Sequence, residues 1–162
     1  MVTGVSRNPK PGLTSAGINF ISADITRPET LRDLTIEWDW IVQCVSSGGG
    51  SAEDYRKVYF DGTRKVLGWL EKTPPVKFLY TSSTGVYGQD DGEWIAENSP
   101  TNPVTESGKV LLSTEGLLLE AHRATGFPEM ILRIAGIYGP GRRRLVRQFL
   151  YGESPSERDR DR

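Results

Sequence analysis

Four consecutive hydroxyl side chains, Thr81 to Thr84, are the first residues of this sequence that could do chemistry. They follow the β-prone run Phe78-Leu79-Tyr80 and precede Gly85. A strand that served packing alone would carry apolar side chains there, because unpaired hydroxyl groups cost free energy in a core. In open α/β sheets, ligands bind outside the carboxyl ends of the strands. Serine and threonine are also ordinary loop and cap residues, so the meaning of this cluster depends on the rest of the chain.

The composition describes a soluble globular protein. The 162 residues fit one domain with a real core, and the net charge of -1 offers no electrostatic attraction to nucleic acid or to an anionic membrane. No apolar run approaches the roughly 20 residues of a membrane span, and the N-terminus lacks the apolar segment of a secretory signal. Cys44 is the single cysteine, which excludes an internal disulfide and fits a reducing compartment, so we expect a cytoplasmic protein.

Alternating strand and helix patterns predict a mostly parallel α/β sheet with helices on both faces. The continuous apolar run from Ile41 to Val45 is typical of a parallel strand covered on both sides. The clearest helix has apolar residues at three- and four-residue steps between Tyr55 and Leu70. Thr26 is a predicted helix cap. The predicted strands lie at residues 2–6, 17–24, 40–45, 76–82 and 130–137, the predicted helices at 26–36, 52–72, 105–124 and 142–151, and a turn-rich loop at 7–12.

Two segments are expected to lack regular structure. The tail 153–162 alternates Arg with Asp or Glu and has no apolar residue, which predicts disorder and leaves residues 1–152 as the domain. The loop 88–103 carries four carboxylates without a neighbouring His or Cys and without regular ligand spacing. We therefore interpret that loop as solvated and predict no metal site.

Three strings, in this order and spacing, resemble the NAD(P)-dependent epimerase/dehydratase branch of the short-chain dehydrogenase/reductase superfamily. They are Tyr59-Phe60-Asp61-Gly62-Thr63, Ser82-Ser83-Thr84-Gly85-Val86-Tyr87-Gly88, and Leu132-Arg133-Ile134-Ala135-Gly136-Ile137-Tyr138-Gly139-Pro140-Gly141. The resemblance covers nearly all of residues 2 to 152 and is closest to the atypical members of that branch. It implies a Rossmann-type NAD(P)-binding fold and an oxidoreductase-like or epimerase/dehydratase-like activity on a small-molecule substrate.

On the cofactor side, the resemblance places Ser6 and Arg7 where the second strand of such domains meets the adenosine ribose. An acidic residue there would bind the 2′-hydroxyl of NAD, whereas an arginine can pair with the 2′-phosphate of NADP. The resemblance thus favours NADP, with NAD possible; a solvated loop arginine is the alternative. It also assigns Asp24 and Ile25 to the adenine ring, Val45, Ser46 and Ser47 to the other side of the adenosine, and Ile134, Ala135 and Gly136 to the cofactor.

On the catalytic side, Ser83 matches the serine or threonine that orients the substrate carbonyl or alcohol in this family. The base of the family is a tyrosine four residues before a lysine, which helps lower the phenol pKa from about 10. Tyr87 belongs to a Val-Tyr-Gly string whose tyrosine is structural in the family, and His122 lies in a polar stretch. Neither is expected to replace the missing base.

Two alignments of the tyrosine position remain open. If Lys109 is the family lysine, Thr105 stands where the tyrosine would be. If Glu115 instead matches the acidic residue that follows in the family, Ser107 takes the tyrosine position and Leu111 the lysine position. Neither alignment supplies a phenol, so catalytic competence is doubtful.

The resemblance also shows which parts of such a domain do not occur in this sequence. The first strand and its Gly-x-Gly-x-x-Gly turn are not found, and Gly48 to Gly50 follow the wrong strand to serve as a phosphate loop. In the strand order 3-2-1-4-5-6 the absent strand is central, so we expect two exposed edges and an unfilled core. We favour a truncated form; the alternatives are a non-catalytic nucleotide-binding or regulatory protein of the same fold, and a non-functional fragment.

Overall fold

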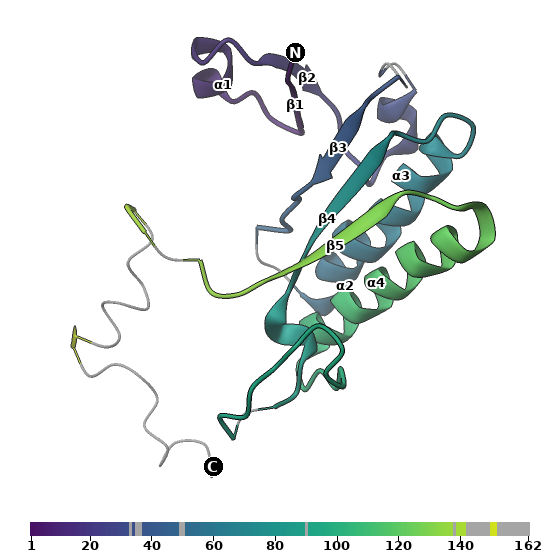
Figure 1. The fold of residues 1–162 in the computed structure, drawn as a ribbon. Helices are drawn as coiled ribbons and strands as arrows, with labels where there is room; N and C mark the ends of the chain where they lie inside the picture. The colour runs from purple at the N-terminus through teal and green to yellow at the C-terminus, as the bar shows by residue number, and fades with distance from the viewer. Residues whose placement is uncertain are drawn as a thin grey trace.

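The computed structural model describes residues 1–32, 34, 37–48, 51–89, 91–137, 139–141 and 150–151. Its strands are all paired in parallel, and they form two separate sheets (Figure 1). The smaller sheet pairs β1 with β2, and in the larger sheet β4 lies between β3 and β5. The strands are β1 (Thr3–Ser6), β2 (Asn19–Ser22), β3 (Trp40–Gln43), β4 (Lys77–Ser83) and β5 (Glu129–Ile134).

Two long helical segments cover one face of the larger sheet (Figure 1). The first runs through α2 (Ala52–Arg56), the π-helix η2 (Lys57–Asp61) and α3 (Gly62–Leu70), and the second is α4 (Glu106–Thr125). Ser51 caps α2 in a reciprocal capping box with Asp54, and the hydroxyl of Thr105 caps α4 by accepting from the Gly108 N–H. These caps explain why the two helices begin where the sequence predicted.

The core lies between these helices and the larger sheet. Phe78 and Tyr80 on β4 are fully buried, as are Leu70 on α3 and Leu118 on α4. On the opposite face of the sheet, Trp40 and Val42 are more than half exposed, and Met130 and Leu132 are also exposed. A parallel sheet flanked by helices is therefore confirmed, but the described long helices all lie on one side of β3, β4 and β5.

A short helix, α1 (Pro11–Ser15), lies beside the smaller sheet. A Cβ on Gly4 would lie 2.8 Å from the Leu13 side chain, so α1 rests on the face of β1 to which Gly4 belongs. Figure 1 shows α1 on the side of β1 and β2 that faces away from α3. The predicted loop at 7–12 is therefore wrong at its end, because helical structure already begins at Pro11.

Among the described residues of the helix predicted at 26–36, the only helical segment is a 3₁₀ turn, η1 (Pro28–Leu31). It is preceded by Arg27, and Thr26 is not its cap. The hydroxyl of Thr26 binds Asp24 instead. The predicted helix at 142–151 falls mostly on residues outside the described ranges, as does the tail 153–162.

Candidate functional site

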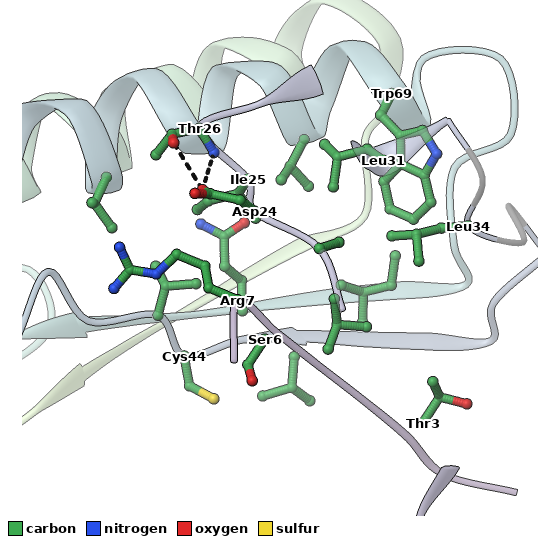
Figure 2. A pocket seen from close by; sticks show the side chains of 18 of the residues that line it. Thr3, Ser6, Arg7, Asp24, Ile25, Thr26, Leu31, Leu34, Cys44 and Trp69 are labelled. Atoms are coloured by element: carbon green, nitrogen blue, oxygen red, sulfur yellow. Dashed lines mark hydrogen bonds between the residues drawn. The ribbon is translucent and has the colours of Figure 1, made fainter. Parts of the chain in front are cut away.

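A cavity of about 590 Å³ lies between the two sheets and is lined by residues of β1, β3 and α3. One part of its wall is polar and comes from the carboxyl ends of three strands. Ser6 ends β1 and Arg7 follows it, Asp24 follows β2, and Ser46 follows β3. Figure 2 shows Arg7, Asp24 and Cys44 on the same side of the cavity. Carboxyl ends of parallel strands are where open α/β sheets bind ligands.

The cavity gathers six of the ten residues assigned to the cofactor from the sequence. These six are Ser6, Arg7, Asp24, Ile25, Val45 and Ser46. Ser47 is not among the lining residues, although it is adjacent in sequence. Ile134, Ala135 and Gly136 lie at the far edge of the larger sheet, where Ile134 pairs with Ser83. The structure thus brings six of the residues assigned to the cofactor together and pairs Ile134 with the candidate catalytic serine.

Asp24 is a polar group of the cavity that is held by two hydrogen bonds. Its Oδ1 accepts a hydrogen bond of 2.8 Å from the Thr26 N–H and another of 2.8 Å from the Thr26 hydroxyl. Partial burial raises the pKa of Asp24, but these two bonds and the nearby charges of Arg7 and Arg27 outweigh it, so the net pKa is lowered. Asp24 is therefore an ionised acceptor at neutral pH.

The segment around Asp24 is fixed to the helical layer. Lys65 on α3 donates from Nζ to the Thr26 carbonyl at 2.8 Å. A Cβ on Gly62 would lie 2.7 Å from Cδ1 of Ile25, so only glycine allows α3 to approach the Ile25 side chain this closely. The contacts of Thr26 and Lys65 were not predicted from the sequence. Thr26 could have been found, because an Asp that accepts from the residue two positions later is a common turn.

Arg7 is held through its backbone, since the Ser22 hydroxyl donates to its carbonyl at 3.1 Å. No ion pair of its guanidinium group occurs within the described ranges. The neighbouring Ser6 hydroxyl donates to the Asn8 carbonyl at 2.7 Å and shapes the turn after β1. The Arg7 charge therefore stands at the polar end of the cavity and can attract an anion.

Ser83 lies apart from the cavity, at the carboxyl end of β4. Its Oγ accepts from the Gly85 N–H at 3.1 Å, which caps the 3₁₀ turn η3 (Thr84–Val86). The hydroxyl proton of Ser83 is thus available to another acceptor. A Cβ on Gly108 would lie 2.5 Å from the Gly85 carbonyl oxygen, so α4 starts directly against this turn.

Beneath Ser83 lies a buried ionic network that the sequence did not predict. The Ser82 hydroxyl donates to Glu115 at 2.5 Å, and Glu115 is fully buried. Arg133 donates to both oxygens of this carboxylate, with its shortest bond, from Nη2, at 2.8 Å. Arg133 also donates to the Tyr87 hydroxyl at 2.7 Å. The network joins β4, α4 and β5 below the hydroxyl cluster.

The structure places the remaining catalytic candidates as follows. Lys109 is more than half exposed and pairs with Glu106 at 2.7 Å. The hydroxyls of Thr105 and Ser107 lie 3.2 Å apart at the start of α4. Glu115 reaches the strand ends through Ser82 and Arg133. Under both alignments a hydroxyl stands in place of the phenol.

Tyr87 and His122 have structural partners. The Tyr87 hydroxyl donates to the Ala96 carbonyl at 3.1 Å while it accepts from Arg133, and Arg133 lies over the Tyr87 ring. His122 contacts the Phe127 carbonyl and Glu129 at the end of α4. These contacts fit the interpretation that neither residue is a base.

Within the described residues, no group of three or more potential metal ligands occurs, and no helix is long and apolar enough to cross a membrane.

Similar proteins share both sequence and fold with this chain. A protein from Methylobacillus flagellatus described as an NAD-dependent epimerase/dehydratase is 37% identical, with a TM-score of 0.71, over 96% of this chain and 52% of its own. The UDP-glucuronic acid 4-epimerase of Bacillus cereus, solved in complex with NAD, is 24% identical with a TM-score of 0.71, over 93% of this chain and 55% of its own.

A curated relative is the yeast (Saccharomyces cerevisiae) sterol-4-alpha-carboxylate 3-dehydrogenase ERG26, decarboxylating. It is 33% identical over 80% of this chain and 39% of its own length. The chain therefore spans about half the length of the solved relatives and less of the curated one. The family model for the NAD dependent epimerase/dehydratase family matches residues 1–152. With the parallel sheets and the order of the three motifs, this match shows that the chain belongs to the NAD-dependent epimerase/dehydratase family.

Proposed function

We propose that residues 1–152 bind the adenosine half of a nicotinamide dinucleotide at the polar end of the cavity. The observation that carries this proposal is the meeting of Ser6, Arg7, Asp24 and Ser46, from three separate segments, at one end of the sheets. The ionised Asp24 carboxylate can accept from the exocyclic amino group of adenine, and the apolar Ile25 can pack on the ring. A cavity of about 590 Å³ lies within the usual range for small-molecule sites.

The residues that line the cavity fit the adenosine half of a nicotinamide dinucleotide. The described residues offer no glycine-rich turn for its pyrophosphate. The bound nicotinamide would supply hydride exchange with a substrate carbon. In this chain, the Ser83 hydroxyl would orient a small-molecule substrate by donating to its carbonyl or accepting from its alcohol. The whole protein would then be an epimerase/dehydratase-like or oxidoreductase-like enzyme, active in the cytoplasm without a nucleic-acid or membrane partner.

Arg7 is proposed to select NADP over NAD. A guanidinium group at this position pairs with a 2′-phosphate, and hydrogen bonds to charged groups contribute about 1.5–3 kcal/mol. The test is the affinity of the chain for 2′,5′-ADP and for 5′-AMP, which differ only in that phosphate and do not need a pyrophosphate site. We expect 2′,5′-ADP to bind about tenfold or more tightly, since 1.4 kcal/mol corresponds to tenfold.

Two variants make this test specific. Arg7→Ala should remove the preference for 2′,5′-ADP, while Arg27→Ala should retain it. Arg27 is the matched control because its charge also acts on Asp24, although it does not line the cavity. An unchanged preference in Arg7→Ala would refute the phosphate role, and binding of neither nucleotide would reject the site itself.

A second function has a specific observation in its favour. Thr105 and Ser107 occupy the two candidate tyrosine positions, and their hydroxyls have no accessible deprotonated form near neutral pH. A protein with this arrangement can bind nucleotide without transferring a proton, as a regulatory or binding module would. Turnover of any substrate that is lost in Ser83→Ala, with nucleotide affinity retained, would favour the enzyme over this alternative.

A further inference from the structure

The loop between β4 and α4 carries a tryptophan that is open to solvent. Trp94 is 99% exposed, and the adjacent Ile95 is 41% exposed. Figure 1 shows this loop projecting beyond the carboxyl end of β4. Tryptophan is among the residues most enriched at the centres of protein interfaces. A single exposed apolar residue needs no explanation by itself, so the surroundings of Trp94 decide what it indicates.

The backbone beside Trp94 is held by side chains from the sheet and its connecting turn. The Tyr87 hydroxyl donates to the Ala96 carbonyl at 3.1 Å. Nη1 of Arg133 donates to the Glu97 carbonyl at 3.3 Å, and Arg133 belongs to the buried network below the hydroxyl cluster. These bonds fix the two peptide units that follow Trp94 and its neighbour. A backbone fixed in advance lowers the entropy cost of binding a partner.

The same loop carries charge of only one sign. Residues 88–104 contain four carboxylates and no lysine or arginine. Three of these carboxylates belong to described residues, and all three residues are exposed: Asp91, Glu93 and Glu97. Among the described residues, none of the three takes part in an ion pair. The exposed ring of Trp94 therefore lies in a stretch of negative charge that a cation can neutralise.

We propose that residues 91–97, here called the Trp94 loop, dock an arginine-bearing segment of a partner protein. A guanidinium group can lie over the Trp94 ring while its N–H groups pair with the Glu93 or Asp91 carboxylate. An apolar residue next to that arginine would cover Ile95. An acidic partner or a nucleic acid would be repelled by the carboxylates, so charge complementarity selects a basic segment. Nucleotide binding is not required for this docking.

The test is a titration of the whole chain with the peptide acetyl-Ala-Arg-Leu-Arg-Ala-amide. Trp94 emission should shift to the blue as the ring is covered, and the shift should saturate. Isothermal titration gives the dissociation constant. A control peptide with citrulline in place of both arginines keeps the shape of the side chains but not their charge, and it should bind about tenfold or more weakly. The affinity for the arginine peptide should fall between about 50 mM and about 500 mM salt, because exposed charges are screened.

Two pairs of variants locate the site. Trp94→Ala should abolish the blue shift and weaken binding by about tenfold or more, as for a central interface residue. Trp40→Ala removes a tryptophan that is 59% exposed on β3, and it should keep both the shift and the affinity. Glu93→Gln should weaken binding by about two- to fivefold, the range of an exposed ion pair. Glu120→Gln removes an exposed carboxylate from α4 and should leave the affinity unchanged. Circular dichroism checks that each variant is folded.

Several results would overturn the docking site. They are no saturable binding of the arginine peptide to the folded chain, equal binding of the citrulline peptide, and an undiminished blue shift in Trp94→Ala. A dimer of the free chain that Trp94→Ala converts to a monomer would also overturn it, because the occupant would then be a second copy. Failure of 5′-AMP to bind would leave the docking site standing, since Asp91, Glu93 and Trp94 do not line the cavity.

Discussion

Removal of Arg133 should destabilise the chain strongly, because Glu115 would keep a buried charge without its partner. The side chain of Glu115 is 1% exposed, and Arg133 donates three hydrogen bonds to it. These bonds raise the pKa of Arg133, although partial burial acts in the opposite direction, so the guanidinium group stays charged. Loss of one partner of such a pair typically costs about 3–5 kcal/mol. We expect this cost for Arg133→Met.

Urea unfolding followed by circular dichroism measures this cost. Lys109→Met on α4, the helix that also carries Glu115, is the matched control. Both side chains of the Lys109–Glu106 pair are exposed, so this pair should contribute less than about 1 kcal/mol. A double variant, Arg133→Met with Glu115→Met, removes both charges. It should be more stable than Arg133→Met alone, because apolar residues of similar size often replace buried ion pairs at little cost.

A strong contribution of the buried pair to stability would be refuted if Arg133→Met lowered the free energy of unfolding by no more than Lys109→Met does. It would also be refuted if the double variant were less stable than Arg133→Met by the full cost of a second independent substitution, since groups in direct contact should not act additively. In either case the buried pair would not hold the strand ends together below Ser83.

Two further predictions concern the positions around the sites. Gly108→Ala should lower the urea midpoint although Ala favours helices, because its Cβ would lie 2.5 Å from the Gly85 carbonyl oxygen; Gly116→Ala on the same helix meets nothing within 4 Å and should stabilise the chain by about 1 kcal/mol. Asp24→Asn should destabilise most near neutral pH, because the lowered pKa of Asp24 contributes stability above its unfolded value that is lost as the pH falls through the folded value. A difference in urea midpoint between Asp24→Asn and wild type that did not shrink in acid would contradict this assignment.

The sequence was sufficient for the order of the strands and of the two long helical segments, but it did not predict α1. Apolar periodicity predicted the helix that became α2, η2 and α3, and the run before Thr81 predicted β4, because buried faces impose regular spacing. Their boundaries depended on local chemistry that periodicity does not carry. The Thr26 hydroxyl donates to Asp24 and does not cap a helix. Among the described residues that follow, the expected helix is a single 3₁₀ turn.

The site was predictable only in part. Strand ends were visible in the sequence, so Arg7, Asp24 and Ser46 could be expected to meet, and they line one cavity. The Glu115–Arg133 pair joins residues 18 positions apart and follows from the packing of α4 on β5, which no local pattern encodes. The expected loss of a central strand agrees with the separation of the two sheets and with the cavity between them.

The most direct test of the nucleotide site is a titration of the isotope-labelled chain with 5′-AMP, followed by the amide resonances in two-dimensional NMR. We expect saturable shifts at the polar end of the cavity and none at the hydroxyl turn of Ser83 and Gly85. The amides expected to shift are those of Ser6, Arg7, Asp24, Ile25, Val45 and Ser46. Shifts confined to the Ser83 turn, or no saturable shift at millimolar 5′-AMP, would contradict a nucleotide site at the polar end of the cavity.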